Sequence, residues 1–177
     1  QEENTNKDEA DVVWVFDMMK ELGVSQHNMA DCSVTSAGDT LFVCTSNGVD
    51  EAHNGIPAPK APSFVAMNKN TKDILWTDAS PGVNVLHGQW SSPSYGVLGG
   101  VPQVMFGGGD GYLYSFAPEG DGKGGAKLLW KFDCNPKTSH YALNKATRNH
   151  IIGTPVIYDG LVYVAVGEDP EHGGGGA

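Results

Sequence analysis

The chain has 177 residues, of which 40% are hydrophobic and 18% are charged, a composition typical of a globular protein rather than a disordered one. Its formal net charge is −10 and its 11 Lys and Arg residues are scattered, which argues against nucleic-acid binding because phosphates are bound by basic clusters. No apolar run approaches the roughly 18 residues that a membrane-spanning helix needs.

Three short segments that each contain a tryptophan divide the chain into repeats. They are VVWVFD at 12–17, DILWTD at 73–78 and KLLWKFD at 127–133. Each is rich in β-forming residues, and each is followed by a polar loop and then by a further pair of β-forming runs. Because this order restarts after every tryptophan, we interpret the three segments as the last strands of successive repeats.

The paired runs between these segments predict β-hairpins. Their two-residue turns are Gly38-Asp39, Gly99-Gly100 and Asp159-Gly160. Glycine and aspartate suit such turns because they tolerate positive φ angles. Further β-forming runs at 63–68 and 112–117 predict a third strand in the first two repeats. No segment has a sustained helical period, and residues 18–26 and 138–148 are each expected to hold at most one short turn of helix.

Four antiparallel strands that recur in one order describe the blades of a β-propeller. A β-sandwich also has short strands, but it would not restart the same strand order in each repeat. We therefore predict an all-β fold in which residues 1–177 belong to one β-propeller domain. Within it we expect the last strand of a preceding blade, two complete blades and the start of a further blade, at 11–17, 31–78, 91–133 and 151–177.

A closed ring needs about 4–8 blades, whereas these segments account for about two and a half. We therefore expect the chain to be a fragment of a longer polypeptide, or its ring to be completed by other subunits. In the hairpin pattern, Cys32 and Cys44 fall on opposite faces of the sheet, which predicts no disulfide between them. With Cys134 the chain has three cysteines, and this odd count leaves at least one thiol free or paired with a group outside the chain.

The segment VAMNKNTKDILW at 65–76 resembles the quinoprotein repeat A-x-D-x-x-T-G-x-x-x-W, whose tryptophan docks between neighbouring blades. Thr71 and Trp76 match the repeat, whereas Asn68 and Lys72 stand where it has Asp and Gly. Longer stretches, such as LHGQWSSPSYG at 86–96, resemble the PQQ-binding-like β-propeller proteins that are common in planctomycetes and related bacteria. The resemblance implies a periplasmic or cell-surface location, and it implies no established reaction.

Polar residues collect in loops that a propeller brings to one face. These are the loops from one blade to the next and the loops between strands two and three. The inter-blade loops supply a candidate ligand-binding set at the mouth of the central channel, namely His27, Asn28, His87, Gln89, Trp90, Arg148 and Asn149. In this set, Trp90 offers a face for stacking and Arg148 offers a fork for a carboxylate or phosphate.

The loops between strands two and three carry acidic residues and histidines. They supply a candidate metal-binding set made of Asp50, Glu51, His53, Asp169, Glu171 and His172. Carboxylates suit Ca²⁺, while histidine with carboxylate suits Zn²⁺ or another transition metal. Neither loop has the regular spacing of a known ligand motif, and solvent-exposed turn residues would give the same pattern.

The enzymes to which such a resemblance points are the PQQ dehydrogenases, which use PQQ and Ca²⁺ as cofactors and have a catalytic Asp and often a disulfide between adjacent cysteines. The chain has no adjacent cysteines, and neither that Asp nor the calcium ligands can be placed on its residues. It also lacks the C-x-x-C-H haem attachment motif and the G-x-S-x-G and H-E-x-x-H motifs of hydrolases. We therefore assign no catalytic residue.

The hypothesis that remains is a non-catalytic, extracytoplasmic propeller that serves as a binding or assembly platform, as the outer-membrane assembly propellers of the same repeat class do. Its expected partners are the rest of the propeller and other proteins, with no nucleic acid and no membrane span. Two alternatives stay open. One is a PQQ- and Ca²⁺-dependent oxidoreductase, and the other is a structural subunit of a larger redox complex.

Overall fold

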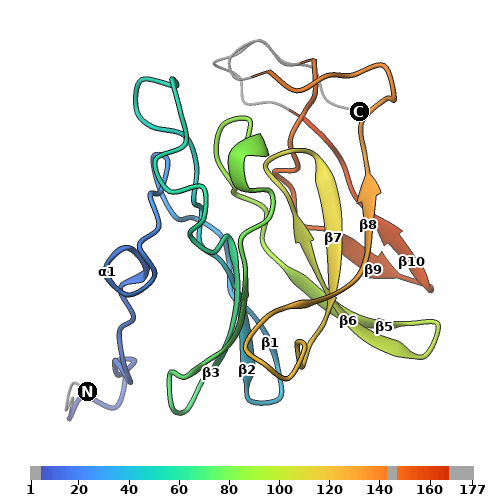
Figure 1. Ribbon diagram of the computed structural model, residues 1–177. Helices are drawn as coiled ribbons and strands as arrows, with labels where there is room; N and C mark the ends of the chain where they lie inside the picture. The colour runs from blue at the N-terminus through green and yellow to red at the C-terminus, as the bar shows by residue number, and fades with distance from the viewer. Residues whose placement is uncertain (1–4, 143–146, 168–177) are drawn as a thin grey trace.

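The computed structural model describes residues 5–142 and 147–167, and its strands form three antiparallel sheets (Figure 1). The first sheet has the order β1-β2-β3-β4, with bounds Thr35–Ala37, Thr40–Cys44, Phe64–Asn68 and Ile74–Asp78. The second has the order β5-β6-β7-β8, with bounds Ser94–Leu98, Val101–Gly107, Tyr112–Ala117 and Lys127–Asp133. The third pairs β9 with β10, at Val156–Tyr158 and Leu161–Tyr163.

The three predicted hairpin turns are confirmed. Each lies between the first two strands of a sheet, so that Leu98 pairs with Val101 across Gly99-Gly100. The two glycines have φ angles of 56° and 80°, the positive values that a two-residue turn with the twist of a β-hairpin requires. The predicted third and fourth strands also form, and they complete both four-stranded sheets.

Both four-stranded sheets carry the same irregularity beside their tryptophan. In the first sheet, Ala66 pairs with Trp76 but the next pair joins Met67 to Ile74, so one residue of β4 is skipped. In the second sheet, the register shifts in the same way after the pair Ser115 and Trp130. A bulge at the same place in both sheets is strong evidence that they are copies of one repeat.

An aromatic core fills the space between the first two sheets. Phe64 of β3 stacks on Phe106 of β6, with ring centroids 4.6 Å apart, and Trp76 of β4 lies 5.7 Å from Phe116 of β7. Trp76 is fully buried, and its indole N–H donates a hydrogen bond of 2.8 Å to the Pro118 carbonyl of the next sheet. This tryptophan therefore packs between sheets, as expected of the repeat.

The loop from β7 to β8, residues 118–126, also reaches back to the first sheet. Thr77 of β4 forms a parallel bridge with Gly125, in which the Thr77 N–H donates to the Gly124 carbonyl and the Ala126 N–H donates to the Thr77 carbonyl, each over 3.2 Å. Gly120 has a φ of 70°, and a Cβ there would lie only 2.6 Å from the Trp76 ring. The loop is thus fitted closely to the neighbouring sheet.

A second apolar cluster joins the second sheet to the third. It is centred on Met105, Leu113, Ile151 and Val166, with Trp130 and Ile157 packed against it. A Cβ on Gly96 of β5 would lie 2.7 Å from the Ile157 side chain, so the backbone of β5 passes very close to β9. The first strands of the sheets are neighbours, because β1 contacts β5 and β5 contacts β9.

The N-terminal segment differs from the prediction, because residues 11–17 form no strand. A strand needs a hydrogen-bonding neighbour, and none lies beside this segment in the part of the chain that the structure describes. Trp14 instead donates from its indole N–H to the Lys69 carbonyl over 2.8 Å, at the turn between β3 and β4. The short helix α1, Met18–Leu22, follows and confirms the turn of helix expected in 18–26.

A second short helical element, the 3-10 turn η1 at Gly82–Asn84, lies in the loop between the first two sheets. The helical turn expected in 138–148 is absent from the described residues of that segment, 138–142 and 147–148.

The positions of Cys32 and Cys44 also differ from the prediction that they lie on opposite faces of the sheet. Both lie within hydrogen-bonding distance of the Gln89 carbonyl, at 3.4 Å and 3.5 Å, and Cys32 packs against the aromatic core that contains Cys44. Strand alternation does not apply to Cys32, because β1 begins only at Thr35. The two sulfurs are therefore on the same side of the sheet, although both are free thiols here.

Candidate functional site

The inter-blade loops and the β2–β3 loop lie at one end of the sheets, and the turns of β1–β2 and β3–β4 lie at the opposite end (Figure 1). We call the first of these ends the loop face. It includes the loop before β1, the β2–β3 loop and the loop before β5 that contains η1. These loops carry most of the described residues that the sequence singled out.

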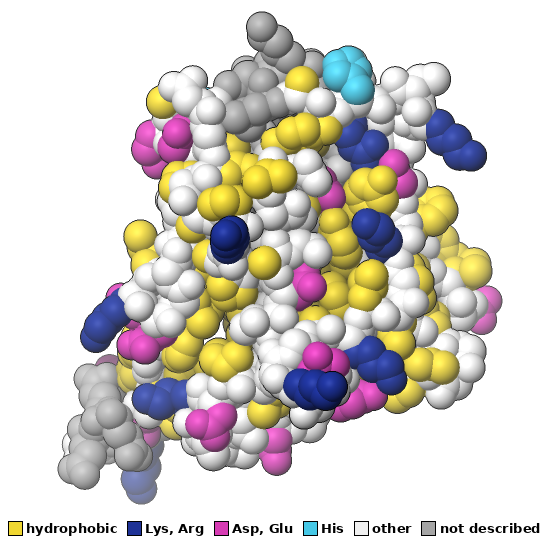
Figure 2. Space-filling view, in the orientation of Figure 1, with side chains coloured by type: hydrophobic (Ala, Val, Ile, Leu, Met, Phe, Trp, Pro, Cys, Tyr) yellow, Lys and Arg dark blue, Asp and Glu magenta, His cyan; other side chains and the backbone are white. Residues whose placement is uncertain are grey.

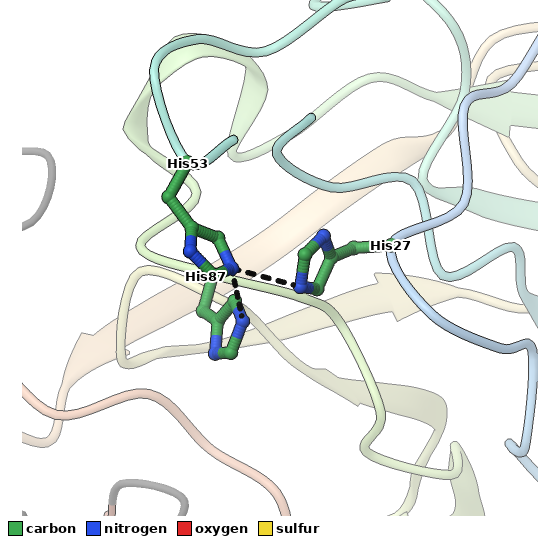
Figure 3. A group of neighbouring side chains, drawn as sticks. All are labelled: His27, His53 and His87. Carbon is green, nitrogen blue, oxygen red and sulfur yellow. Dashed lines mark hydrogen bonds between the residues drawn. The ribbon is translucent and has the colours of Figure 1, made fainter. Parts of the chain in front are cut away.

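Three histidines from these three loops converge on one point (Figure 3). His27 comes from the loop before β1, His53 from the β2–β3 loop and His87 from the loop before β5. The Nε2 atom of His53 lies 3.1 Å from Nε2 of His27 and 3.0 Å from Nε2 of His87. We call this group the histidine cluster. It joins one residue of the predicted metal set to two residues of the predicted ligand set.

A backbone carbonyl fixes the orientation of the His27 ring. Nδ1 of His27 lies 3.0 Å from the Val49 carbonyl oxygen, which can only accept a hydrogen bond. Nδ1 therefore carries the ring proton in the neutral imidazole, and Nε2 presents its lone pair to the other two histidines. The side chain is 2% exposed, so the surrounding protein holds the ring in place.

The backbone at Gly48 brings the loops of His27 and His87 together. A Cβ on Gly48 would lie 2.8 Å from the His27 Cβ and 2.8 Å from the His87 carbonyl oxygen. The Gly48 N–H donates to the Ser25 carbonyl, and the Val49 N–H donates to the His87 carbonyl, each over 2.9 Å. Only glycine permits this close approach, and the bonds on either side fix the separation of the two histidines.

A tight turn presents His53 to the cluster. Its φ angle is 53°, in the left-handed region, and its N–H donates to the Asp50 carbonyl over 2.9 Å. The carboxylate of Asp50, a predicted metal ligand, accepts a 2.7 Å hydrogen bond from the Asn54 N–H and so stabilises this turn. Glu51 is exposed. The remaining predicted metal ligands, Asp169, Glu171 and His172, lie outside the described residues.

Comparisons with known proteins bear on the arrangement of the sheets. No protein-family model and no curated protein matches the sequence. Among solved structures, BamB from Moraxella catarrhalis superposes on 74% of the chain with a TM-score of 0.51 and 18% sequence identity. Quinohemoprotein alcohol dehydrogenase from Comamonas testosteroni superposes on 80% of the chain with a TM-score of 0.50 and 14% identity.

The chain has a β-propeller fold. The likeness at these identities extends to the fold alone, and the chain spans 32% of the BamB chain and 17% of the dehydrogenase chain. The predicted fold class is thus confirmed, and the four-stranded sheets are propeller blades. In the part of the chain that the structure describes, none of the helices has the length and apolar character needed to cross a bilayer.

Between the two blades, Gln89 acts as a structural link. Its side-chain N–H₂ donates to the Asn47 carbonyl and to the Ser63 hydroxyl, each over 2.8 Å, and its side chain is fully buried. Its Oε1 accepts a longer bond of 3.5 Å from the Gly109 N–H. The polar atoms of this predicted ligand-binding residue are therefore used within the propeller.

Arg148 is similarly engaged. Its guanidinium makes a two-pronged ion pair with Asp133, including a 3.1 Å bond from Nη1 to Oδ2, and it also donates to the Asp110 carbonyl. It stacks on Tyr112, with the guanidinium carbon 5.1 Å from the ring centroid. With only 10% of the side chain exposed, this fork is already filled by a carboxylate of the same chain.

These interactions set the ionisation of the carboxylates around Arg148. Burial raises the pKa of Asp110, although its carboxylate accepts a 2.8 Å bond from the Tyr114 hydroxyl. Partial burial also acts to raise the pKa of Asp133, but the hydrogen bonds from Arg148 and the Asn135 N–H outweigh it and hold that pKa below the usual value. Asp133 is thus a charged partner that stabilises Arg148.

The other predicted ligand-binding residues surround the cluster or lie apart from it. Trp90 is half-buried, and its ring stands edge-on to His87 with centroids 5.1 Å apart. Asn28 is exposed beside His27, in a left-handed conformation with a φ of 59°. Asn149 is tied through its backbone to the side chain of Asn135, by bonds of 2.7 Å and 2.8 Å.

His150 is a neighbour that sequence reasoning did not select. Its ring is 2% exposed, lies parallel to the His87 ring at a centroid distance of 6.3 Å, and stands edge-on to Trp90 at 5.7 Å. It directly follows the predicted residues Arg148 and Asn149 in the loop before β9, and this position was the signal that could have found it.

Proposed function

We propose that this propeller is a non-catalytic, extracytoplasmic binding or assembly platform, and that its loop face is the binding face. The observation that supports this most is the gathering of four side chains from three loops onto one face, namely His27, His53, His87 and Trp90. Loops held by a rigid scaffold are where propellers and other folds carry their binding residues. The location outside the cytoplasm rests on the resemblance to the PQQ-binding-like proteins.

The charge distribution favours a protein or small-molecule partner. In the space-filling view, basic and acidic side chains are interspersed over the visible face, and no basic patch of the kind that binds nucleic acid stands out (Figure 2). The net charge of −10 also opposes nucleic-acid binding. We therefore propose proteins as the partners of the loop face, and no nucleic acid.

Further blades are the second kind of partner that we propose. Large apolar side chains are exposed in the N-terminal segment, in β8 and in β9, for example Val15 at 77%, Phe132 at 62% and Tyr158 at 69%. A propeller blade normally covers such residues with its neighbour. Additional blades, in the same polypeptide or in another subunit, would bury these side chains and complete the ring.

Site-specific photocrosslinking in the native host tests the platform role. A photoreactive residue at Glu51, exposed on the loop face, is expected to give defined protein adducts in the extracytoplasmic fraction. The matched control is Asp39, whose side chain is 66% exposed in the β1–β2 turn at the opposite end. Adducts that form equally from both positions, or that never form from Glu51, would overturn the proposal.

The alternative is a PQQ- and Ca²⁺-dependent oxidoreductase or a subunit of a redox complex. Incubation of the purified protein with PQQ and Ca²⁺, followed by gel filtration, separates this class from the platform. The platform hypothesis expects no quinone absorbance to travel with the protein. Stoichiometric retention of the quinone would replace it with the oxidoreductase.

A further inference from the structure

We infer that the histidine cluster, His27, His53 and His87, binds a single first-row transition-metal ion of the Zn²⁺ type. This inference goes beyond the platform role and does not depend on it. It rests on the convergence of three imidazole nitrogens from three loops, on the way one ring is oriented from behind, and on the kind of donor atoms present. Each of these points to a metal ion for a separate reason.

The spacing of the three nitrogens is close to that of a coordination sphere. One ligand nitrogen from each histidine lies within 4.8 Å of the others, and two of the pairs are at 3.0 Å and 3.1 Å. Zn–N bonds of about 2.0–2.1 Å separate two ligands of a tetrahedral ion by about 3.3–3.4 Å. Outward movements of a few tenths of an ångström at those two pairs would admit the ion, together with an approach of the His27 and His87 nitrogens by up to about 1.4 Å from the 4.8 Å limit.

The protonation of the rings also favours a cation at the centre. Because His27 keeps its proton on Nδ1, its Nε2 can only accept. If His53 carries its proton on Nε2, that one proton faces both His27 and His87, since both lie within hydrogen-bonding distance of that atom. If it does not, the lone pairs of His53 and His27 face each other over 3.1 Å. A metal ion would instead accept the lone pairs of all three nitrogens.

The contact behind His27 is the support that metal ligands usually have. A histidine that binds a metal generally donates its other ring N–H to a carboxylate or a backbone carbonyl, which fixes the tautomer and the ring direction. The Val49 carbonyl supplies this contact at 3.0 Å, and Gly48 holds the His27 and His87 segments together beside it. The geometry of two ligands is thus set before any ion binds.

The donor atoms select the class of ion. All three are imidazole nitrogens, which suit Zn²⁺, Cu²⁺ or Ni²⁺, whereas Ca²⁺ and Mg²⁺ need oxygen ligands. The nearby Asp50 carboxylate is bonded to its own turn. Three protein ligands leave one position of a tetrahedral ion for water or for an external donor. The half-buried Trp90 ring stands beside His87, one of the three ligands.

Metal binding by the purified, metal-stripped protein tests the inference, with Zn²⁺ as the probe and a chromophoric chelator as competitor. We expect one Zn²⁺ per chain to survive gel filtration. His53→Asn removes one ligand and keeps a residue that tolerates the left-handed φ of 53°. Since loss of a supporting residue alone weakens binding about 10–100-fold, loss of this ligand should weaken it by about 100-fold or more.

The matched control is His140→Asn, because His140 is exposed and its ring contacts Thr147 away from the cluster. It should leave Zn²⁺ affinity unchanged. His87→Gln provides a second ligand variant if His53→Asn does not fold, and circular dichroism checks the fold of each. Cobalt replacement adds a direct readout, since low-coordinate Co²⁺ gives intense visible bands that the ligand variants should lose. Absence of Zn²⁺ from the folded wild type, or equal affinity in wild type and ligand variants, would overturn the inference.

Discussion

Trp76 and Trp130 occupy equivalent places in the two blades, yet replacing each with phenylalanine should have different costs. Trp76 is fully buried between the blades and donates to the Pro118 carbonyl over 2.8 Å. Trp130 is half-buried and donates to Oε1 of Gln103 over 2.8 Å. The pair therefore compares one side chain in two environments within a single molecule.

The magnitude for Trp76→Phe follows from volume and hydrogen bonding. The substitution removes roughly 40 Å³ of buried side chain, which costs about 1 kcal/mol at ~24 cal/mol per Å³ of cavity. The Pro118 carbonyl also loses its donor, which costs about 1–2 kcal/mol when an enclosed acceptor is left without a partner. We expect the free energy of unfolding to fall by about 2–3 kcal/mol.

Trp130→Phe should cost about 1 kcal/mol or less, because Oε1 of Gln103 keeps a second donor, the Ser115 hydroxyl at 2.7 Å. Equilibrium urea unfolding, followed by circular dichroism, measures both values from the midpoint and the m-value. The reasoning is refuted if Trp130→Phe costs as much as Trp76→Phe. It is also refuted if Trp76→Phe leaves the unfolding midpoint unchanged.

Three other predictions use the same unfolding assay or a thiol titration. Gly111→Ala should lower the free energy of unfolding by about 2 kcal/mol or more, since φ is 80° and an added Cβ would collide with Asn135. Gly99→Ala should lower it clearly less, because an added Cβ there meets nothing within 4 Å. Oxidised glutathione should convert the Cys32 and Cys44 thiols to a disulfide and release two glutathiones. Both thiols lie within hydrogen-bonding distance of the Gln89 carbonyl, and a hydrogen bond from Cys44 lowers the pKa of Cys32. Continued titration of all three thiols would contradict this. Arg148→Met should lower the free energy of unfolding at neutral pH. The difference in this free energy between variant and wild type should shrink as pH falls below the usual Asp pKa of 3.8, because the pKa of Asp133 is depressed in the folded protein. A difference that grows in acid would contradict this.

The strands were predictable because their signals are local. A few neighbouring residues are enough to recognise the turn residues Gly99 and Gly100 and the tryptophans of β4 and β8. The structure places them in the expected turns and strands. Segment 12–17 has the same local signal but no strand forms, since a strand depends on a neighbour that local sequence does not supply. Cys32 was misplaced for a similar reason, because strand alternation was extended beyond the start of β1.

The candidate site was predictable in its parts but not in its grouping. His27, His53 and His87 were all predicted, but they were divided between two hypotheses by the type of loop that carries them. His27 and His87 lie in inter-blade loops, and His53 lies in the β2–β3 loop. The backbone approach at Gly48 and the left-handed turn at His53 help to bring them together, and neither can be read from a local pattern. Gln89 and Arg148 have the residue types of a ligand site, but their partners are other groups of this chain.

The bridge between Thr77 and Gly125 has a consequence for how the two blades unfold. An extended hairpin loop would ordinarily tolerate deletion, but this one supplies the hydrogen-bonding partner of β4 and the acceptor of the Trp76 indole. Together with the aromatic core, this loop should make the two blades unfold as one cooperative unit. Shortening residues 118–126 should weaken the coupling, so hydrogen exchange in β4 should become faster relative to β6.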